Sequence, residues 1–252
     1  PTLDGLANDE VDRIRGVLRE TRFGLIDLSG HRIGVLDVGE GKSLVLLHSI
    51  GLDRWSWLRT LPYLAQHRRV IALDLPGHGQ DVGAEVSSLR GFSEIICSAA
   101  GQLDLREVHL CGLSMGGTLA LDIALRGTNL VSRVTTVAAV ADGFPAARQR
   151  AEAGLAEGVA AQIEATLERW FTAEERASAA WQVRFAASRL QKMTPRGWAD
   201  AWNALATAAL STRLEAMPCP ATTIAGSADA SVSPATMEAI AAKIPGARFA
   251  VV

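Results

Sequence analysis

Ser114 is the residue of this sequence whose setting most clearly favours covalent chemistry. It lies in the segment 112–117, Gly-Leu-Ser-Met-Gly-Gly, which follows an apolar run over residues 108–111 and precedes a helical pattern. A serine in such a strand-to-helix turn has a strained backbone, so its neighbours two positions away must be small, as Gly112 and Gly116 are. The helix N-terminus beneath the hydroxyl would favour a developing negative charge. The pattern predicts that Ser114 is a nucleophile.

The composition is typical of a globular protein of ordinary charge. The chain has 252 residues, of which 48% are hydrophobic and 21% charged, and its formal net charge is −2. This length suits one large α/β domain, or one domain with an insertion. Because there is no basic run and no apolar segment long enough to span a bilayer, we expect neither a nucleic-acid nor a membrane partner.

The cysteines and the first residues of the chain favour the cytoplasm. Cys97, Cys111 and Cys219 are odd in number and widely spaced, which predicts buried free thiols in a reducing compartment. Residues 1–20 are too polar for a signal peptide. The sequence contains no metal-ligand spacing, and we expect no cofactor.

Alternating strand and helix patterns predict a mostly parallel, doubly wound sheet with helices on both faces. Strands are expected over residues 23–28, 32–38, 44–47, 70–73, 108–111, 134–140, 221–225 and 247–252. Helices are expected over residues 9–20, 55–64, 93–103 and 234–243. The first two strands are predicted to form a hairpin at Ser29-Gly30-His31.

Residues 145–217 differ in character from the rest of the chain. They are rich in Ala, Arg and Glu, show no strand pattern and hold four of the six tryptophans. This predicts about four helices inserted as a cap between two strands, one of them beginning at Thr194-Pro195 with Thr194 as its N-cap. The core would then consist of residues 1–144 and 218–252.

Several polar residues follow predicted strands and should share one rim of the sheet. In parallel sheets the ligand site lies at the C-terminal ends of the strands. The segments and residues concerned are His48-Ser49-Ile50-Gly51, Gly77-His78-Gly79, Ser114, Asp142 and Asp229. They are therefore predicted to lie beneath the helical insertion.

From about residue 23 onward the chain resembles α/β-hydrolases. The resemblance rests on His48-Ser49-Ile50-Gly51, Asp74-Leu75-Pro76-Gly77-His78-Gly79, the segment 112–117 and Gly226-Ser227-Ala228-Asp229. Within that family it is most similar to 3-oxoadipate enol-lactonases, which have a Ser-Leu-Gly loop where this chain has Ser49-Ile50-Gly51. They also have a cap segment similar to residues 169–173. His48 departs from their pattern, which usually has Asn there.

The resemblance implies catalytic roles for residues along the rim. The family order is nucleophile, acid, histidine, which makes Ser114 the nucleophile and Asp229 the acid that orients the histidine. Asp142 also follows a strand and is the competing candidate for the acid. Ile50 and Met115 would give backbone N–H groups to the oxyanion.

Two further residues are candidates for binding substrate. Ser49 could add a hydroxyl contact beside the oxyanion, although a purely structural loop serine is an equal alternative. Trp170 is chosen among the tryptophans of the insertion because it lies in the lactonase-like segment 169–173. The alternative for each tryptophan is packing between the helices of the cap.

The histidine that the triad requires is missing from this sequence. All five histidines precede Ser114. His48 and His78 are the alternative candidates for the base, but they lie in loops that the family uses for architecture. His31, His67 and His109 have the settings of a hairpin, a surface and a strand residue. We therefore expect the natural protein to continue past Val252 with a histidine-bearing loop and a final helix. A natural end at Val252 would instead leave Ser114 without a base and favour a binding role.

These observations together predict a serine hydrolase. Its expected substrate is an ester or lactone of a small carboxylic acid, with 3-oxoadipate enol-lactone as the leading candidate, cleaved through an acyl-enzyme on Ser114. The alternatives are a carboxylesterase, a carbon–carbon bond hydrolase, and a catalytically inactive hydrolase fold that binds a ligand.

Overall fold

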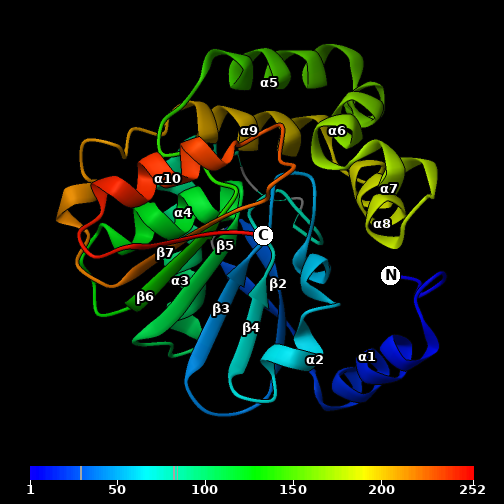
Figure 1. The fold of residues 1–252 in the computed structure, drawn as a ribbon, viewed down its shortest axis with the longest axis horizontal. Helices are drawn as coiled ribbons and strands as arrows, with labels where there is room; N and C mark the ends of the chain where they lie inside the picture. The colour runs from blue at the N-terminus through cyan, green and yellow to red at the C-terminus, as the bar shows by residue number, and fades with distance from the viewer. Residues whose placement is uncertain (29, 82, 84) are drawn as a thin grey trace.

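The computed structural model of the protein describes residues 1–28, 30–81, 83 and 85–252. The described residues form one eight-stranded sheet with the order β1-β2-β4-β3-β5-β6-β7-β8 (Figure 1). The strands are β1 (Arg22–Leu28), β2 (His31–Val38), β3 (Ser43–Leu47), β4 (Arg69–Leu73), β5 (Val108–Leu113), β6 (Val131–Val137), β7 (Ala221–Ala225) and β8 (Arg248–Val251). The pairs β1–β2 and β2–β4 are antiparallel and all the other pairs are parallel. The predicted mostly parallel sheet is confirmed.

The central strands are buried because their side chains are apolar on both faces. Residues 44–47 of β3 and 70–73 of β4 are all buried, as expected for strands covered on both sides. The hairpin of β1 and β2 pairs Leu28 with His31. Of the predicted turn, Ser29 lies outside the described residues.

Helices outside the insertion cover both faces of the sheet. These helices are α1 (Asn8–Glu20), the 3-10 helix η1 (Arg54–Trp57), α2 (Leu61–Leu64), α3 (Leu89–Gln102), α4 (Met115–Ala124) and α10 (Pro234–Lys243). Side chains of α3, α4 and α10 belong to the larger hydrophobic core. Ile14 and Val17 of α1 and Leu61 of α2 belong to a second core, with Leu44 and Leu46 of β3. Because each core packs helices against the sheet, the sheet is covered by helices on both faces, as in a doubly wound fold. None of the described helices is both long and apolar enough to cross a lipid bilayer.

Residues 145–217, all of them described, are helical but more divided than predicted. They form α5 (Pro145–Glu157), η2 (Val159–Gln162), α6 (Ile163–Trp170), α7 (Ala173–Ala177), α8 (Trp181–Leu190), α9 (Pro195–Ala206) and η3 (Leu214–Ala216). The α-helices of this insertion lie together at one end of the molecule (Figure 1). The prediction of about four helices was therefore too low, since a capping box at Thr172 starts the short helix α7. The predicted N-cap is confirmed, because the Thr194 hydroxyl accepts the Gly197 N–H at 3.0 Å.

Three predicted boundaries were wrong for local reasons. Residues 55–64 form two short helices, because Asp53 caps η1 and Pro62 sits in the first turn of α2. The helix expected from residue 93 begins at Leu89, since the Ser88 side chain caps it by accepting the Gly91 N–H. The strand expected over 134–140 ends at Val137, because Ala138 has φ +48°.

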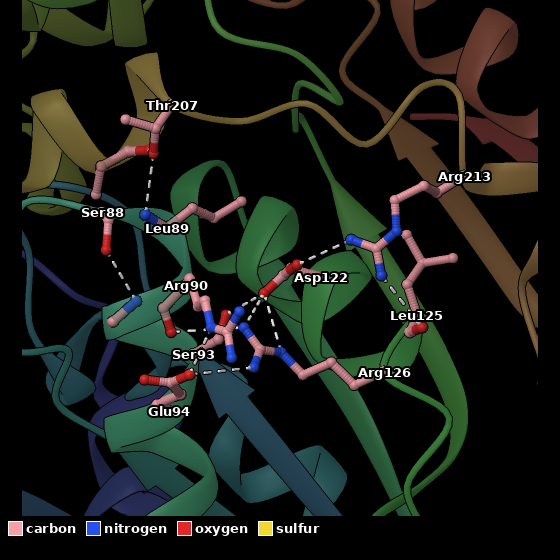
Figure 2. A network of polar contacts seen from close by, with 12 residues as sticks. Ser88, Leu89, Arg90, Ser93, Glu94, Asp122, Leu125, Arg126, Thr207 and Arg213 are labelled. Carbon is pink, nitrogen blue, oxygen red and sulfur yellow. Dashed lines mark hydrogen bonds and ion pairs between the residues drawn. The ribbon is translucent and has the colours of Figure 1, made fainter.

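A buried carboxylate ties the end of the insertion to the core. Figure 2 shows Asp122 of α4 at the centre of a polar network that reaches α3 and the segment after α9. The Ser93 hydroxyl donates to Asp122 at 2.7 Å, Arg126 pairs with it at 2.7 Å, and Arg213 lies 3.6 Å away. Because Asp122 is 6% exposed, these partners offset the cost of burying its charge. The network fixes where the chain returns from the insertion to the sheet.

Candidate active site

Ser114 occupies the strained turn that the glycine spacing predicts. It lies between β5 and α4 with φ 53° and ψ −117°, a backbone conformation that residues with a side chain rarely adopt. Its N–H donates to the Val137 carbonyl of β6 at 2.8 Å, and its own carbonyl accepts the Thr118 N–H at 3.0 Å. These hydrogen bonds attach the turn to strand β6 and helix α4. They therefore hold Ser114 in its strained backbone conformation.

The glycines on either side of Ser114 are required by close backbone contacts. A Cβ on Gly112 would lie 2.0 Å from the Gly116 carbonyl oxygen, and one on Gly116 would lie 2.3 Å from the Leu47 carbonyl oxygen. Neither backbone oxygen can move without disturbing the sheet or the helix. The structure thus supplies the physical reason for small residues two positions before and after the serine.

Ser114 opens into a cavity of about 670 Å³ between the sheet and the insertion. This volume is in the range of sites that bind small molecules. Four residues singled out from the sequence line it together: Ser49, Ser114, Trp170 and Asp229. They come from the loop after β3, the turn after β5, helix α6 and the loop after β7. The fold brings these distant segments together at the C-terminal ends of the parallel strands.

Asp229 shares this cavity with Ser114, whereas Asp142 does not. One carboxylate oxygen of Asp229, Oδ1, accepts the N–H groups of Ser231 at 2.7 Å and Val232 at 2.9 Å. Among the described residues no partner occupies its other oxygen, which leaves Oδ2 able to accept a hydrogen bond from an imidazole. Asp142 lines a separate cavity of about 600 Å³ and accepts the N–H groups of Leu210 and Ser211. Its position therefore favours a role in anchoring the insertion.

The two predicted oxyanion donors lie on backbone near Ser114. Ile50 follows Ser49, and Met115 is the first residue of α4, so its N–H points out of the helix N-terminus without an intrahelical acceptor. Within the part of the chain that the structure describes, neither N–H donates to a protein acceptor. Both residues are buried, Ile50 at 2% and Met115 at 0% exposure. Neither residue is among those that line the Ser114 cavity, so the oxyanion role of their N–H groups stays a prediction.

His48 fixes the Ser49-Ile50 loop. Its Nε2 accepts the Leu75 N–H at 2.9 Å, so Nδ1 carries the proton and donates to the Ser49 carbonyl at 2.7 Å. Burial, followed by the nearby His78, lowers the pKa of His48 well below its ordinary value. Its ring is fully buried and has no free nitrogen, which agrees with the architectural role expected for it.

His78 is also buried away from the cavity. Its Nδ1 donates to the Pro76 carbonyl at 2.8 Å, and its ring lies 5.2 Å from that of His48. Burial lowers the pKa of His78 to about 4, so it is neutral near pH 7. Neither histidine lines the Ser114 cavity.

The tryptophans of the insertion divide between the cavity and the interior. Trp170 and Trp181 line the cavity, whereas Trp198 and Trp202 pack against each other in the core at 0% and 6% exposure. Sequence reasoning missed Trp181 because nothing in its own segment distinguishes it from the other three. It also missed Arg169 as a lining residue, although Arg169 opens the quoted segment 169–173.

The chain belongs to the α/β hydrolase family, whose model, described as "Alpha/beta hydrolase family", matches residues 44–252. It is 35% identical over 156 residues to (E)-2-((N-methylformamido)methylene)succinate hydrolase of Acinetobacter baylyi, covering 60% of this chain and 59% of that protein. It is 30% identical over 192 residues to 3-oxoadipate enol-lactonase 1 of the same organism, covering 74% of this chain and 71% of that enzyme. The first alignment thus spans less than two thirds of the relative's length.

A solved structure shows the same fold over nearly the whole chain. The enol-lactonase from Burkholderia xenovorans LB400 superposes with a TM-score of 0.87 at 26% sequence identity, and the match covers 91% of each chain. This similarity confirms the α/β-hydrolase fold and the likeness to enol-lactonases expected from the motifs.

Proposed function

We propose that the protein hydrolyses a small ester or lactone through an acyl-enzyme on Ser114. The observation that carries the proposal is the strained Ser114 turn, which opens into the same cavity as Asp229. In this mechanism the Ser114 oxygen attacks the carbonyl carbon, and a base removes the hydroxyl proton. The N–H groups of Ile50 and Met115 stabilise the resulting oxyanion, each by about 3–4 kcal/mol of barrier. Collapse releases the leaving group, and water then hydrolyses the ester to Ser114.

No histidine of the described residues is placed to act as the base in this mechanism. All five histidines of the sequence precede Ser114, and none lines its cavity. Val252 does line it, and the Val252 carbonyl accepts the Ser227 N–H at 2.6 Å beside the Asp229 loop. Val252 therefore lies at the edge of this cavity, beside Asp229. There, Oδ2 of Asp229 could accept the Nδ1–H of an imidazole.

Residues 145–217 act in this proposal as a helical cap on a core of residues 1–144 and 218–252. The support is that α6 and α8 supply the cavity wall that faces Ser114. The substrate proposed first is 3-oxoadipate enol-lactone, from the likeness to enol-lactonases. A cytoplasmic location stays a prediction.

A serine-reactive fluorophosphonate probe tests the proposal. The full-length protein should be labelled at Ser114, identified by peptide mapping, because only a serine with an activated hydroxyl reacts rapidly. Ser114→Ala should remain unlabelled. A folded full-length protein that resists the probe would rule out the acyl-enzyme mechanism. A panel of lactones and aryl esters then separates a lactonase from a carboxylesterase.

Trp170→Ala is expected to raise KM, or to change selectivity among lactones, by about 10- to 100-fold. An aromatic ring buried against a ligand contributes about 1.5–3 kcal/mol, and Trp170 is half-buried at the cavity wall. Steady-state kinetics with two lactones of different size measures the effect. Trp198→Ala is the matched comparison: it should mainly lower Tm, because Trp198 is fully buried. If Trp170→Ala changes only Tm, its role is packing.

A further inference from the structure

Helix α8 of the insertion forms one wall of the Ser114 cavity and also packs toward the core. Four of its residues line the cavity: Trp181, Gln182, Phe185 and Ala186. Of these, Trp181 and Phe185 also belong to the second hydrophobic core, together with Ile14 and Val17 of α1. The two aromatic rings stack on each other with their centroids 5.0 Å apart. A movement of α8 would therefore change the cavity and the packing against α1 together.

The N-terminal segment of the chain, residues 1–20, bonds directly to the first turn of α8. The Nε1–H of Trp181 donates to the Thr2 carbonyl at 2.9 Å, and the Arg184 guanidinium donates to the Asp4 carbonyl. In Figure 1 the first residues of the chain lie beside α8. Because α1 packs in the second hydrophobic core, the N-terminal segment joins this wall of the cavity to the body of the protein.

Arg59, which lies between η1 and α2, adds a second connection from α1 to the α8 wall. Its guanidinium pairs with the Glu10 carboxylate through two hydrogen bonds and donates to the Gln182 side-chain carbonyl at 3.4 Å. Gln182 in turn donates to Glu175 of α7 at 2.8 Å. The Glu10 side chain is 18% exposed, so the ion pair is partly shielded from water and salt. A continuous series of contacts therefore connects α1 with Gln182 and Glu175, which both line the cavity.

The two ends of α8 are held by different parts of the protein. At the C-terminal end, Arg189 pairs with Asp53 at 3.1 Å, and Asp53 is the N-cap of η1. At the N-terminal end, Trp181 and Gln182 bond to the N-terminal segment and to Arg59. The residues that hold this second end are not among the described residues that line the cavity: Thr2, Asp4, Glu10 and Arg59. Any effect of these four on the substrate would thus pass through α8.

We propose that residues 2–10 and Arg59 are positioning residues for substrate selection, because they hold the α8 wall in place across the Ser114 cavity. This role rests on the proposed function. A wall that is fixed favours a substrate that fills the cavity as it stands, and a wall released at one end admits a larger substrate. The reacting groups should be unaffected, since Ser114 is bonded to β6 and α4, and Asp229 to residues of its own loop.

Glu10→Gln tests this assignment, because it breaks the ion pair with Arg59 at a site away from the cavity. In the full-length protein, KM for phenyl acetate should rise about threefold to fivefold, the loss expected when a partly exposed ion pair is broken, while kcat changes little. Preference should move by a similar factor toward a larger ester, either phenyl hexanoate or 1-naphthyl acetate, which are enlarged on opposite sides of the carbonyl. Amide hydrogen exchange over residues 181–186 should also become faster, since the first turn of α8 opens more often.

Two further variants and a control show whether the effect passes through the ion pair. Arg59→Gln should raise KM for phenyl acetate at least as much as Glu10→Gln, and the double variant should raise it no more than Arg59→Gln alone. Asp9→Asn is the matched control, because Asp9 forms an exposed ion pair with Arg13 within the same helix. It should leave KM, the preference among esters and the exchange of residues 181–186 unchanged.

Several outcomes would overturn the assignment. Unchanged KM and ester preference in Glu10→Gln, whatever its Tm, would show that the N-terminal segment has a structural role only. A fall in kcat at constant KM would place the effect on the reacting groups, and an equal effect in Asp9→Asn would trace it to the stability of α1.

The same measurements separate this assignment from the hydrolase proposal. If Ser114 resists the phosphonate probe, the hydrolase proposal fails; faster exchange of residues 181–186 in Glu10→Gln then still supports the holding of α8, and unchanged exchange overturns it. If the protein hydrolyses esters while none of the variants shifts KM or ester preference, the positioning role fails and the hydrolase proposal stands.

Discussion

Ser114→Ala is expected to lower kcat for ester or lactone hydrolysis by the full-length protein about 10⁶-fold, the typical loss when a triad acts as a unit. Without the hydroxyl no acyl-enzyme forms, and only the oxyanion donors and substrate binding remain. The fold should be retained, because alanine keeps the Cβ that already sits at φ 53°. Steady-state kinetics with an aryl ester, together with a thermal melt, measures both effects.

Ser227→Ala is the matched control for this substitution. Ser227 also lines the cavity, and its backbone N–H, not its side chain, donates to Val252. The control should therefore change kcat little. Retention of most activity in Ser114→Ala, or an equal loss in Ser227→Ala, would show that another group is the nucleophile.

Asp229→Asn is expected to lower kcat about 10⁴-fold, since an amide would hold the histidine in the wrong tautomer. The loop should survive, because the amide oxygen can still accept the N–H groups of Ser231 and Val232 that now bond to Oδ1. The rate should be measured at saturating substrate across a pH range, so that a change in the base's pKa is separated from loss of catalysis.

Asp142→Asn provides the comparison for the acid. Asp142 follows a strand, as Asp229 does, but it lines a different cavity and bonds to the N–H groups of Leu210 and Ser211. Its substitution should leave kcat nearly unchanged and at most lower Tm. The reverse ranking of the two variants would assign the acid to Asp142.

The elements that sequence reasoning located well are those with strong local signals. The strand Ala221–Ala225 lies where it was predicted, directly after Pro218 and Pro220. The helix Pro234–Lys243 also lies where it was predicted, with Pro at its start. Short helices were harder: residues 55–64 and the insertion divide where caps and prolines interrupt helical hydrogen bonding. A hydrophobic pattern is judged over a window of many residues and does not resolve such short interruptions. The helix boundaries in these segments were missed for this reason.

The sequence by itself determined the parallel α/β architecture and the position of the serine turn. Both follow from near neighbours: apolar runs long enough for buried strands, and Gly112 and Gly116 on either side of Ser114. Only the tertiary structure decided that Asp229 shares the Ser114 cavity while Asp142 does not. Which residues share a cavity depends on which distant segments the sheet and the insertion bring together. The local sequence pattern does not contain this information.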